Sequence, residues 1–128
     1  MSVTAGFDAR VERAGLEFLA AFYAAETRRH PGNLEALSEL GHVLTKLGRF
    51  EEGLAVDRRL VELAPESDTA RYNLACSLAL CGRREEALDE LEHAVRLGYD
   101  DLPHLLADED LRGLREEPRF RALVERLR

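Results

Sequence analysis

The sequence predicts an all-α protein, an α-α superhelix of stacked antiparallel helical hairpins. Composition is the first observation behind this prediction. Leu, Ala, Glu and Arg, which favour helices, supply 74 of the 128 residues, whereas Val, Thr and Ile, which favour strands, supply 11. The second is an internal repeat, because residues 34–67 and 68–101 are identical at ten positions when aligned at an offset of 34 residues. The third is that apolar residues within each repeat recur with the period of a helix.

The first element we expect is a helix over residues 8–30, with Asp8 as its N-cap. Pro31, directly after it, lies 34 residues before Pro65. Because equivalent positions are 34 residues apart, this helix would occupy the second-helix position of a half repeat that precedes the two complete repeats.

Each complete repeat is predicted to form a helix, a tight turn and a second helix. Three apolar residues of the first repeat share one helical face: Leu37, Leu40 and Leu44. Gly48 then interrupts the pattern, and its counterpart in the second repeat is Gly82. Glycines at this place are expected to end each first helix in the left-handed conformation.

Two further features recur in both repeats. Acidic pairs fall in the expected first turn of each second helix, where the helix dipole favours negative charge: Glu51-Glu52 and Glu85-Glu86. Small residues stand at equivalent sites on both helices: Gly41 and Gly53 in the first repeat, and Ala75 and Ala87 in the second. Small side chains at these sites would let the two antiparallel helices approach closely.

At these positions the sequence resembles the tetratricopeptide repeat, a 34-residue helical hairpin with a Leu-Gly pair in its first helix. The matching residues are Leu40, Gly41, Gly48, Phe50 and Pro65 in the first repeat, and Leu74, Ala75, Leu78, Gly82, Ala87, Leu91 and Ala94 in the second. Asp57 departs from the pattern, because the family prefers an aromatic residue there. The resemblance implies a non-catalytic adapter or scaffold that binds another protein or peptide.

The last segment, residues 102–128, resembles the helical cap that closes such arrays. We expect short helices over 102–106 and 109–115, and a last helix that starts near Pro118, a residue suited to a first helical turn. Apolar residues of this last helix would cover the exposed face of the second repeat: Phe120, Leu123, Val124 and Leu127. The whole chain, residues 1–128, is thus expected to form a single domain.

The candidate binding site is the concave groove lined by the first helix of each repeat. Its exposed stripe is expected to consist of Glu35, Ser38, Glu39, His42 and Lys46 in the first repeat and Thr69, Tyr72, Asn73, Cys76 and Leu80 in the second. The resemblance implies that Asn73 hydrogen-bonds the backbone of an extended peptide, and the alternative is that Asn is simply frequent at this place. Ser38 and His42 replace residues with which some relatives clamp the carboxylate of chaperone tails, so that ligand is not expected.

A second hypothesis is a structural homo-oligomer. The first helix carries more aromatic surface than one buried face needs, and a second copy, as in a homodimer, would cover the face around Leu16, Phe18, Phe22 and Tyr23. A third hypothesis, an enzyme, lacks a sequence motif, and the four histidines fall in different elements: His30, His42, His93 and His104. We therefore expect no catalysis, no cofactor and no metal site.

The net charge of −7 argues against nucleic acid and anionic membranes as partners. Cys76 and Cys81 match no metal or redox spacing and are expected to stay reduced. No apolar stretch approaches the roughly 20 residues needed to span a bilayer, and the N-terminus lacks the pattern of a secretion signal. These features together predict a cytoplasmic protein.

Overall fold

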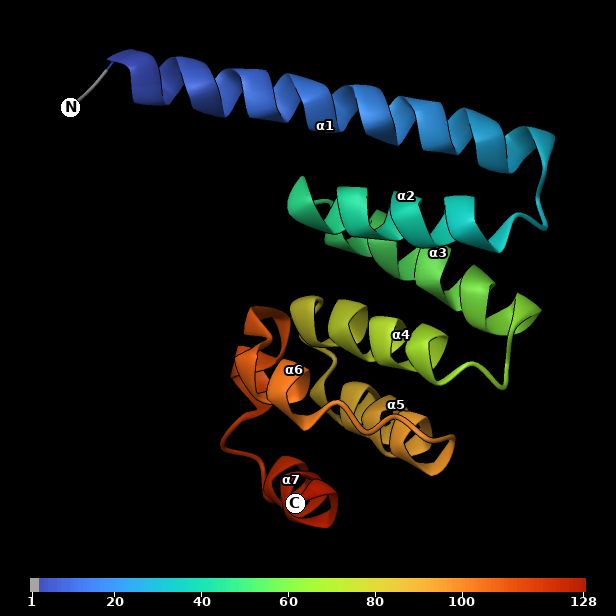
Figure 1. The fold of residues 1–128 in the computed structure, drawn as a ribbon, viewed down its shortest axis with the longest axis vertical. Coiled ribbons are helices and arrows are strands. Elements are labelled where there is room, and N and C mark those ends of the chain that lie inside the picture. The colour runs from blue at the N-terminus through green and yellow to red at the C-terminus, as the bar shows by residue number, and fades with distance from the viewer. Residues whose placement is uncertain (1–2) are drawn as a thin grey trace.

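The structure, a computed structural model, describes the backbone of residues 3–128 and the side chains of residues 6–128. Residues 1–2, which the predicted domain includes, lie outside the described residues. The elements in chain order are α1 (Val3–Arg29), α2 (Leu34–Lys46), α3 (Phe50–Leu63), α4 (Asp68–Leu80), α5 (Arg84–Arg96), α6 (Leu102–Ala107), the 3-10 helix η1 (Glu109–Leu114) and α7 (Pro118–Leu127). Figure 1 shows them as a stack with α1 at one end and α7 at the other. The described part contains no strand, and the all-α, tetratricopeptide-like fold is confirmed.

Two antiparallel hairpins, α2 with α3 and α4 with α5, form the middle of the stack. Gly48 and Gly82 have φ angles of 77° and 78°, the left-handed conformation that the sequence predicts. The residue after each glycine donates its N–H across the turn, from Arg49 to the Leu44 carbonyl and equivalently in the second hairpin, at 2.9 Å. Both predicted acidic pairs lie in the first turn of α3 and of α5.

The helices of each hairpin approach closely at the small residues. A Cβ added at Gly41 would lie 2.7 Å from Oδ1 of Asp57, which is closer than such atoms approach, and one at Gly53 would lie 3.4 Å from Oγ1 of Thr45. The corresponding Ala75 and Ala87 of the second hairpin are fully buried. The sequence prediction of tight crossings is therefore correct, and Asp57 belongs to the first of them.

The main hydrophobic core runs from the hairpins into the C-terminal segment. Its largest fully buried side chains are leucines: Leu78, Leu88, Leu91, Leu105, Leu111 and Leu114. η1 packs against α4, and α7 packs against α5. Phe120, Leu123 and Val124 join this core, as expected of residues that cover the second repeat. The C-terminal segment, residues 102–128, is called the cap below.

The N-terminal helix is longer than predicted. It begins at Val3 and passes through Asp8, which is therefore not an N-cap. No proline interrupts the chain before Arg29, and once a helix is nucleated each further residue adds a hydrogen bond, so that Val3, Thr4 and Gly6 extend it despite their low helix propensity.

The apolar face predicted on this helix is in fact two faces. Leu16 and Tyr23 are half-buried and pack against a small core of α2 residues together with Ala20. Phe18 and Phe22 point away from it and are exposed. The expectation that all four aromatic and aliphatic residues form one exposed surface is wrong, because the helix turns Leu16 and Tyr23 toward α2.

Candidate functional site

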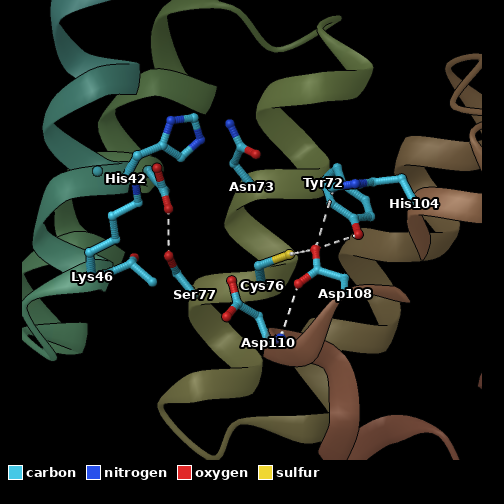
Figure 2. Close-up of a pocket in the computed structure, with 12 residues that line it drawn as sticks. His42, Lys46, Tyr72, Asn73, Cys76, Ser77, His104, Asp108 and Asp110 are labelled. Carbon is cyan, nitrogen blue, oxygen red and sulfur yellow. Dashed lines mark hydrogen bonds and ion pairs between the residues drawn. The ribbon is translucent and has the colours of Figure 1, made fainter. Parts of the chain in front are cut away.

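Two adjacent hollows lie between α2 and α4, and the larger one also borders the cap. The larger has a volume of about 410 Å³, and most of its lining residues are labelled in Figure 2: His42, Lys46, Tyr72, Asn73, Cys76, Ser77, His104, Asp108 and Asp110. The smaller, about 240 Å³, is lined mainly by the start of α2 and the start of α4. Asn73 lines both hollows, which therefore adjoin along α2, and the two together are called the groove below.

Most of the predicted site residues lie along this groove. His42, Lys46, Tyr72, Asn73 and Cys76 line the larger hollow. Glu35, Ser38 and Thr69 line the smaller one with Asn73. Neither hollow includes the other two predicted residues, the exposed Glu39 on α2 and the half-buried Leu80 at the end of α4.

Tyr72 and Cys76 were expected to be exposed, and this expectation is wrong. Their exposed fractions are 4% and 8%. The Tyr72 hydroxyl donates to Oδ2 of Asp108 at 2.7 Å, and the Cys76 thiol lies 3.6 Å from the same oxygen. The Tyr72 ring also stacks on Tyr99, with ring centroids 4.4 Å apart. The cap therefore covers much of the α4 side of the groove and leaves only a small part of these two side chains exposed in the larger hollow.

Asp108 is the residue that fastens the cap to α4. Its Oδ1 accepts the N–H of Asp110 at 3.0 Å as the N-cap of η1, while its Oδ2 faces Tyr72 and Cys76. Arg115 donates to its backbone carbonyl at 3.2 Å. Sequence reasoning did not assign this role, although an Asp directly before a helical segment is a recognisable capping signal. Its contacts with α4 span more than 30 residues of sequence, which no local pattern reports.

Burial and neighbouring acids favour the protonated forms of the groups around Asp108. Burial, with a further contribution from Asp108, raises the pKa of the Cys76 thiol well above its usual range. The same two causes raise the pKa of Asp110, and burial raises that of Tyr72. A thiol must lose its proton to act as a nucleophile, so Cys76 is unsuited to covalent catalysis at neutral pH.

Cys76, Asp108 and Asp110 are the one group of metal-ligand types that the described residues bring together, within 4.8 Å of one another. Thiolate and carboxylate oxygens are ligands that Zn²⁺ accepts. Here both carboxylate oxygens of Asp108 already accept hydrogen bonds, and the raised thiol pKa opposes the deprotonation that a metal ligand requires. The arrangement is thus explained by its hydrogen bonds as a contact between α4 and the cap.

A second buried acid lies beneath the groove. Asp57 on α3 is 5% exposed and accepts a hydrogen bond from the Ser77 hydroxyl on α4. Burial raises its pKa, and the Ser77 hydrogen bond opposes that shift only in part. This pair joins the two hairpins through a polar contact inside an otherwise apolar interface.

The open part of the groove is polar and basic on its α2 side. His42 and Lys46 are exposed, and Asn73 is half-buried on the opposite wall. Figure 2 shows the His42 ring and the Asn73 amide in the upper part of the view, on different helices and away from the Asp108 contact. These side chains are available to a partner, whereas those beneath the cap are not.

Together the stacked hairpins and the groove define a tetratricopeptide-like helical-repeat domain. The chain belongs to the bacterial transcriptional activator domain family, which matches residues 12–128. It is similar to a TPR repeat-containing thioredoxin of Arabidopsis thaliana, at 35% identity over 74 residues, which are 58% of this chain and 11% of that protein. It is also similar to a chloroplastic protein of the same plant, at 31% identity over 88 residues, which are 66% of this chain and 26% of that protein.

The chain thus spans about a tenth and a quarter of these two curated relatives. Repeat families of this kind bind proteins and are generally non-catalytic, so the chain is a protein-interaction module. Among the helices of residues 3–128, none is long and apolar enough to cross a membrane.

Proposed function

We propose that this domain binds an extended peptide segment of another protein in the groove, without catalysis. The observation that carries the proposal is that Asn73 lines both hollows, which adjoin along α2. An Asn side chain offers a carbonyl acceptor and an amide donor, which is the pair that a peptide backbone requires.

The length of the groove sets the length of the ligand. α2, which forms one wall, has 13 residues and is therefore about 20 Å long. An extended peptide rises about 3.3 Å per residue, so the groove accommodates about six residues. The exposed His42 and Lys46 lie at one end and Glu35 at the other, and three aspartates also line the larger hollow. Charges of both signs therefore face the ligand, which favours recognition through its backbone over selection for an acidic side chain.

Peptides of about six residues, selected by phage display against the whole chain, test this proposal. We expect Asn73→Ala to weaken their binding about tenfold in fluorescence anisotropy, because backbone hydrogen bonds are lost. Glu39→Ala is the matched control, since Glu39 is exposed on α2 and lines neither hollow. Selected peptides that bind Asn73→Ala as tightly as the native chain would overturn the proposal.

We further infer that the partner is a component of a bacterial transcription regulator, because the family to which the chain belongs is the bacterial transcriptional activator domain. The net charge of −7 favours contact with protein over contact with DNA. The free thiols of Cys76 and Cys81 fit the reducing cytoplasm in which such a regulator acts. Anisotropy of a labelled DNA duplex at low salt tests the preference for protein over DNA, and the expected result is no binding of the duplex.

A further inference from the structure

The helix α1 has apolar side chains on two opposite sides. On one side Leu16, Ala20 and Tyr23 pack against α2. On the other side four large apolar residues are exposed, called the outer stripe below: Phe7 at 58%, Val11 at 54%, Phe18 at 69% and Phe22 at 50%. Figure 1 shows α1 as the outermost helix at its end of the stack, with α2 on its inner side. A helix with a single partner needs only one apolar side, so the outer stripe indicates a second partner.

The exposed area is large for a chain of this size. Taking about 200 Å² for a whole phenylalanine side chain, the three phenylalanines alone leave roughly 350 Å² in contact with water. With Val11 and with Leu19 at the edge of the stripe, which is 38% exposed, the exposed apolar area on this side of α1 reaches roughly 500 Å². If two copies each bury this area, the interface approaches the roughly 1,000 Å² at which specific protein interfaces begin.

The order of residues along the outer stripe is symmetrical. Its midpoint falls between Ala14 and Gly15, so Phe7 and Phe22 are equally far from it. Val11 and Phe18 are likewise equidistant from that midpoint. Two small residues thus stand at the centre and a phenylalanine stands at each end. A Cβ added at Gly15 would meet no atom within 4 Å.

We propose that the outer stripe binds the outer stripe of a second copy of this chain, with the two α1 helices antiparallel and crossing at Ala14 and Gly15. A two-fold dimer requires one surface that is complementary to itself, and the symmetry of the stripe supplies this. Phe7 then meets Phe22 of the second copy, and Val11 meets Phe18 of the second copy. The small central residues let the two backbones approach closely, as small residues do at other helix crossings.

The charges beside the stripe agree with this register. Arg10 on one edge of the stripe comes opposite Glu17 of the second copy, offset by about 3 Å along the axis. Glu17 also lies 3.6 Å from Arg13 and from Arg49 of its own chain, so Arg10 would join an existing group of ion pairs. The contact forms twice because of the two-fold symmetry. The acids on the other edge, Asp8 and Glu12, face Leu19 and Gly15 of the second copy, so no like charges meet.

Sedimentation equilibrium of the whole chain tests the dimer, and the expected mass at about 100 µM is twice 14.4 kDa. Phe18→Glu should weaken the dimer at least about a hundredfold, because it places an unpaired charge in the interface. Its helicity should be unchanged, because Phe18 is exposed within the chain. The matched control Leu63→Glu, an equally drastic change at an exposed residue of α3, should leave the dimer intact.

A charge exchange tests the antiparallel register. Arg10→Glu alone should weaken the dimer about tenfold, and Arg10→Glu combined with Glu17→Arg should restore it, because the pair is reversed. The single variant Glu17→Arg measures separately the cost of losing the contacts of Glu17 with Arg13 and Arg49 within the chain. A native chain that is monomeric at about 100 µM, or a dimer that survives Phe18→Glu, would overturn the proposal. A monomer would assign the outer stripe to a helix of a different protein. Peptide binding in the groove is independent of these results, since the outer stripe lies on the side of α1 away from α2.

Discussion

The crossing of α2 and α3 offers a test of the packing, because the effect of one substitution on the free energy of unfolding should change sign when a second residue is replaced. Gly41→Ala places a Cβ 2.7 Å from Oδ1 of Asp57, whose carboxylate is buried and held by Ser77. Replacing Gly by Ala inside a helix stabilises it by about 1 kcal/mol. Forcing an extra carbon into a packed interface costs about 1 to 3 kcal/mol. The net expectation is a loss of about 1 kcal/mol in the free energy of unfolding.

The same substitution should be stabilising once the carboxylate is removed. In an Asp57→Ala background the space beside Gly41 is open, so Gly41→Ala should gain about 1 kcal/mol from helix propensity alone. The second hairpin supports this reasoning, since Ala75 and Leu91 occupy the positions of Gly41 and Asp57 there without conflict. The coupling free energy of the double-mutant cycle is therefore about 2 kcal/mol.

Urea denaturation of the four proteins, monitored by circular dichroism, measures this cycle. Gly53→Ala serves as a control, because its Cβ would meet Thr45 only at 3.4 Å and should be tolerated. A Gly41→Ala substitution that shifts the free energy of unfolding equally in both backgrounds would refute the steric argument.

Three further predictions follow from polar contacts. Burial raises the pKa of Asp57, so the folded state binds the proton of this carboxyl group more tightly than the unfolded state does. Protonated Asp57 therefore contributes to stability at low pH, and this contribution is lost as the pH rises through the pKa of the folded state. Asp57→Asn should therefore unfold at a higher urea concentration than the native chain at pH 7, and this advantage should vanish at acid pH. Tyr72→Phe should destabilise the protein by about 1 to 2 kcal/mol and speed amide hydrogen exchange in the cap, because Asp108 loses a donor at 2.7 Å; unchanged exchange would argue against the contact. Arg119 on α7 pairs with Glu92 on α5 at 2.7 Å. Arg119→Ala should therefore lower the free energy of unfolding by about 1 kcal/mol at low salt and by less at high salt. A loss of stability that does not depend on salt would contradict the ionic origin.

The cap decides which part of the concave side remains available. By covering Tyr72 and Cys76 it leaves the α2 wall and Asn73 as the open surface. The groove of this protein is thus narrower than two stacked hairpins alone would make it.

Local signals in the sequence were sufficient for the repeats. The left-handed glycines, the acidic first turns and the tight crossings each depend on residues within one helical hairpin, where backbone geometry and helix dipoles act over a few residues. The extent of α1 was predicted less well, because a capping residue such as Asp8 does not start a helix where the chain before it is also helical, and Val3, Thr4 and Gly6 join α1 despite their low helix propensity.

The sequence by itself determined the all-α stack of hairpins, since a 34-residue period and its glycine turns admit few other folds. Only the tertiary structure decided which predicted groove residues are accessible and how the aromatic residues of α1 divide between two sides. Tyr72 meets Asp108 across 36 residues of sequence, and such a contact depends on how the cap packs. The outer stripe is likewise defined by where α2 lies, because exposure is a property of the neighbours of a side chain and not of the side chain alone.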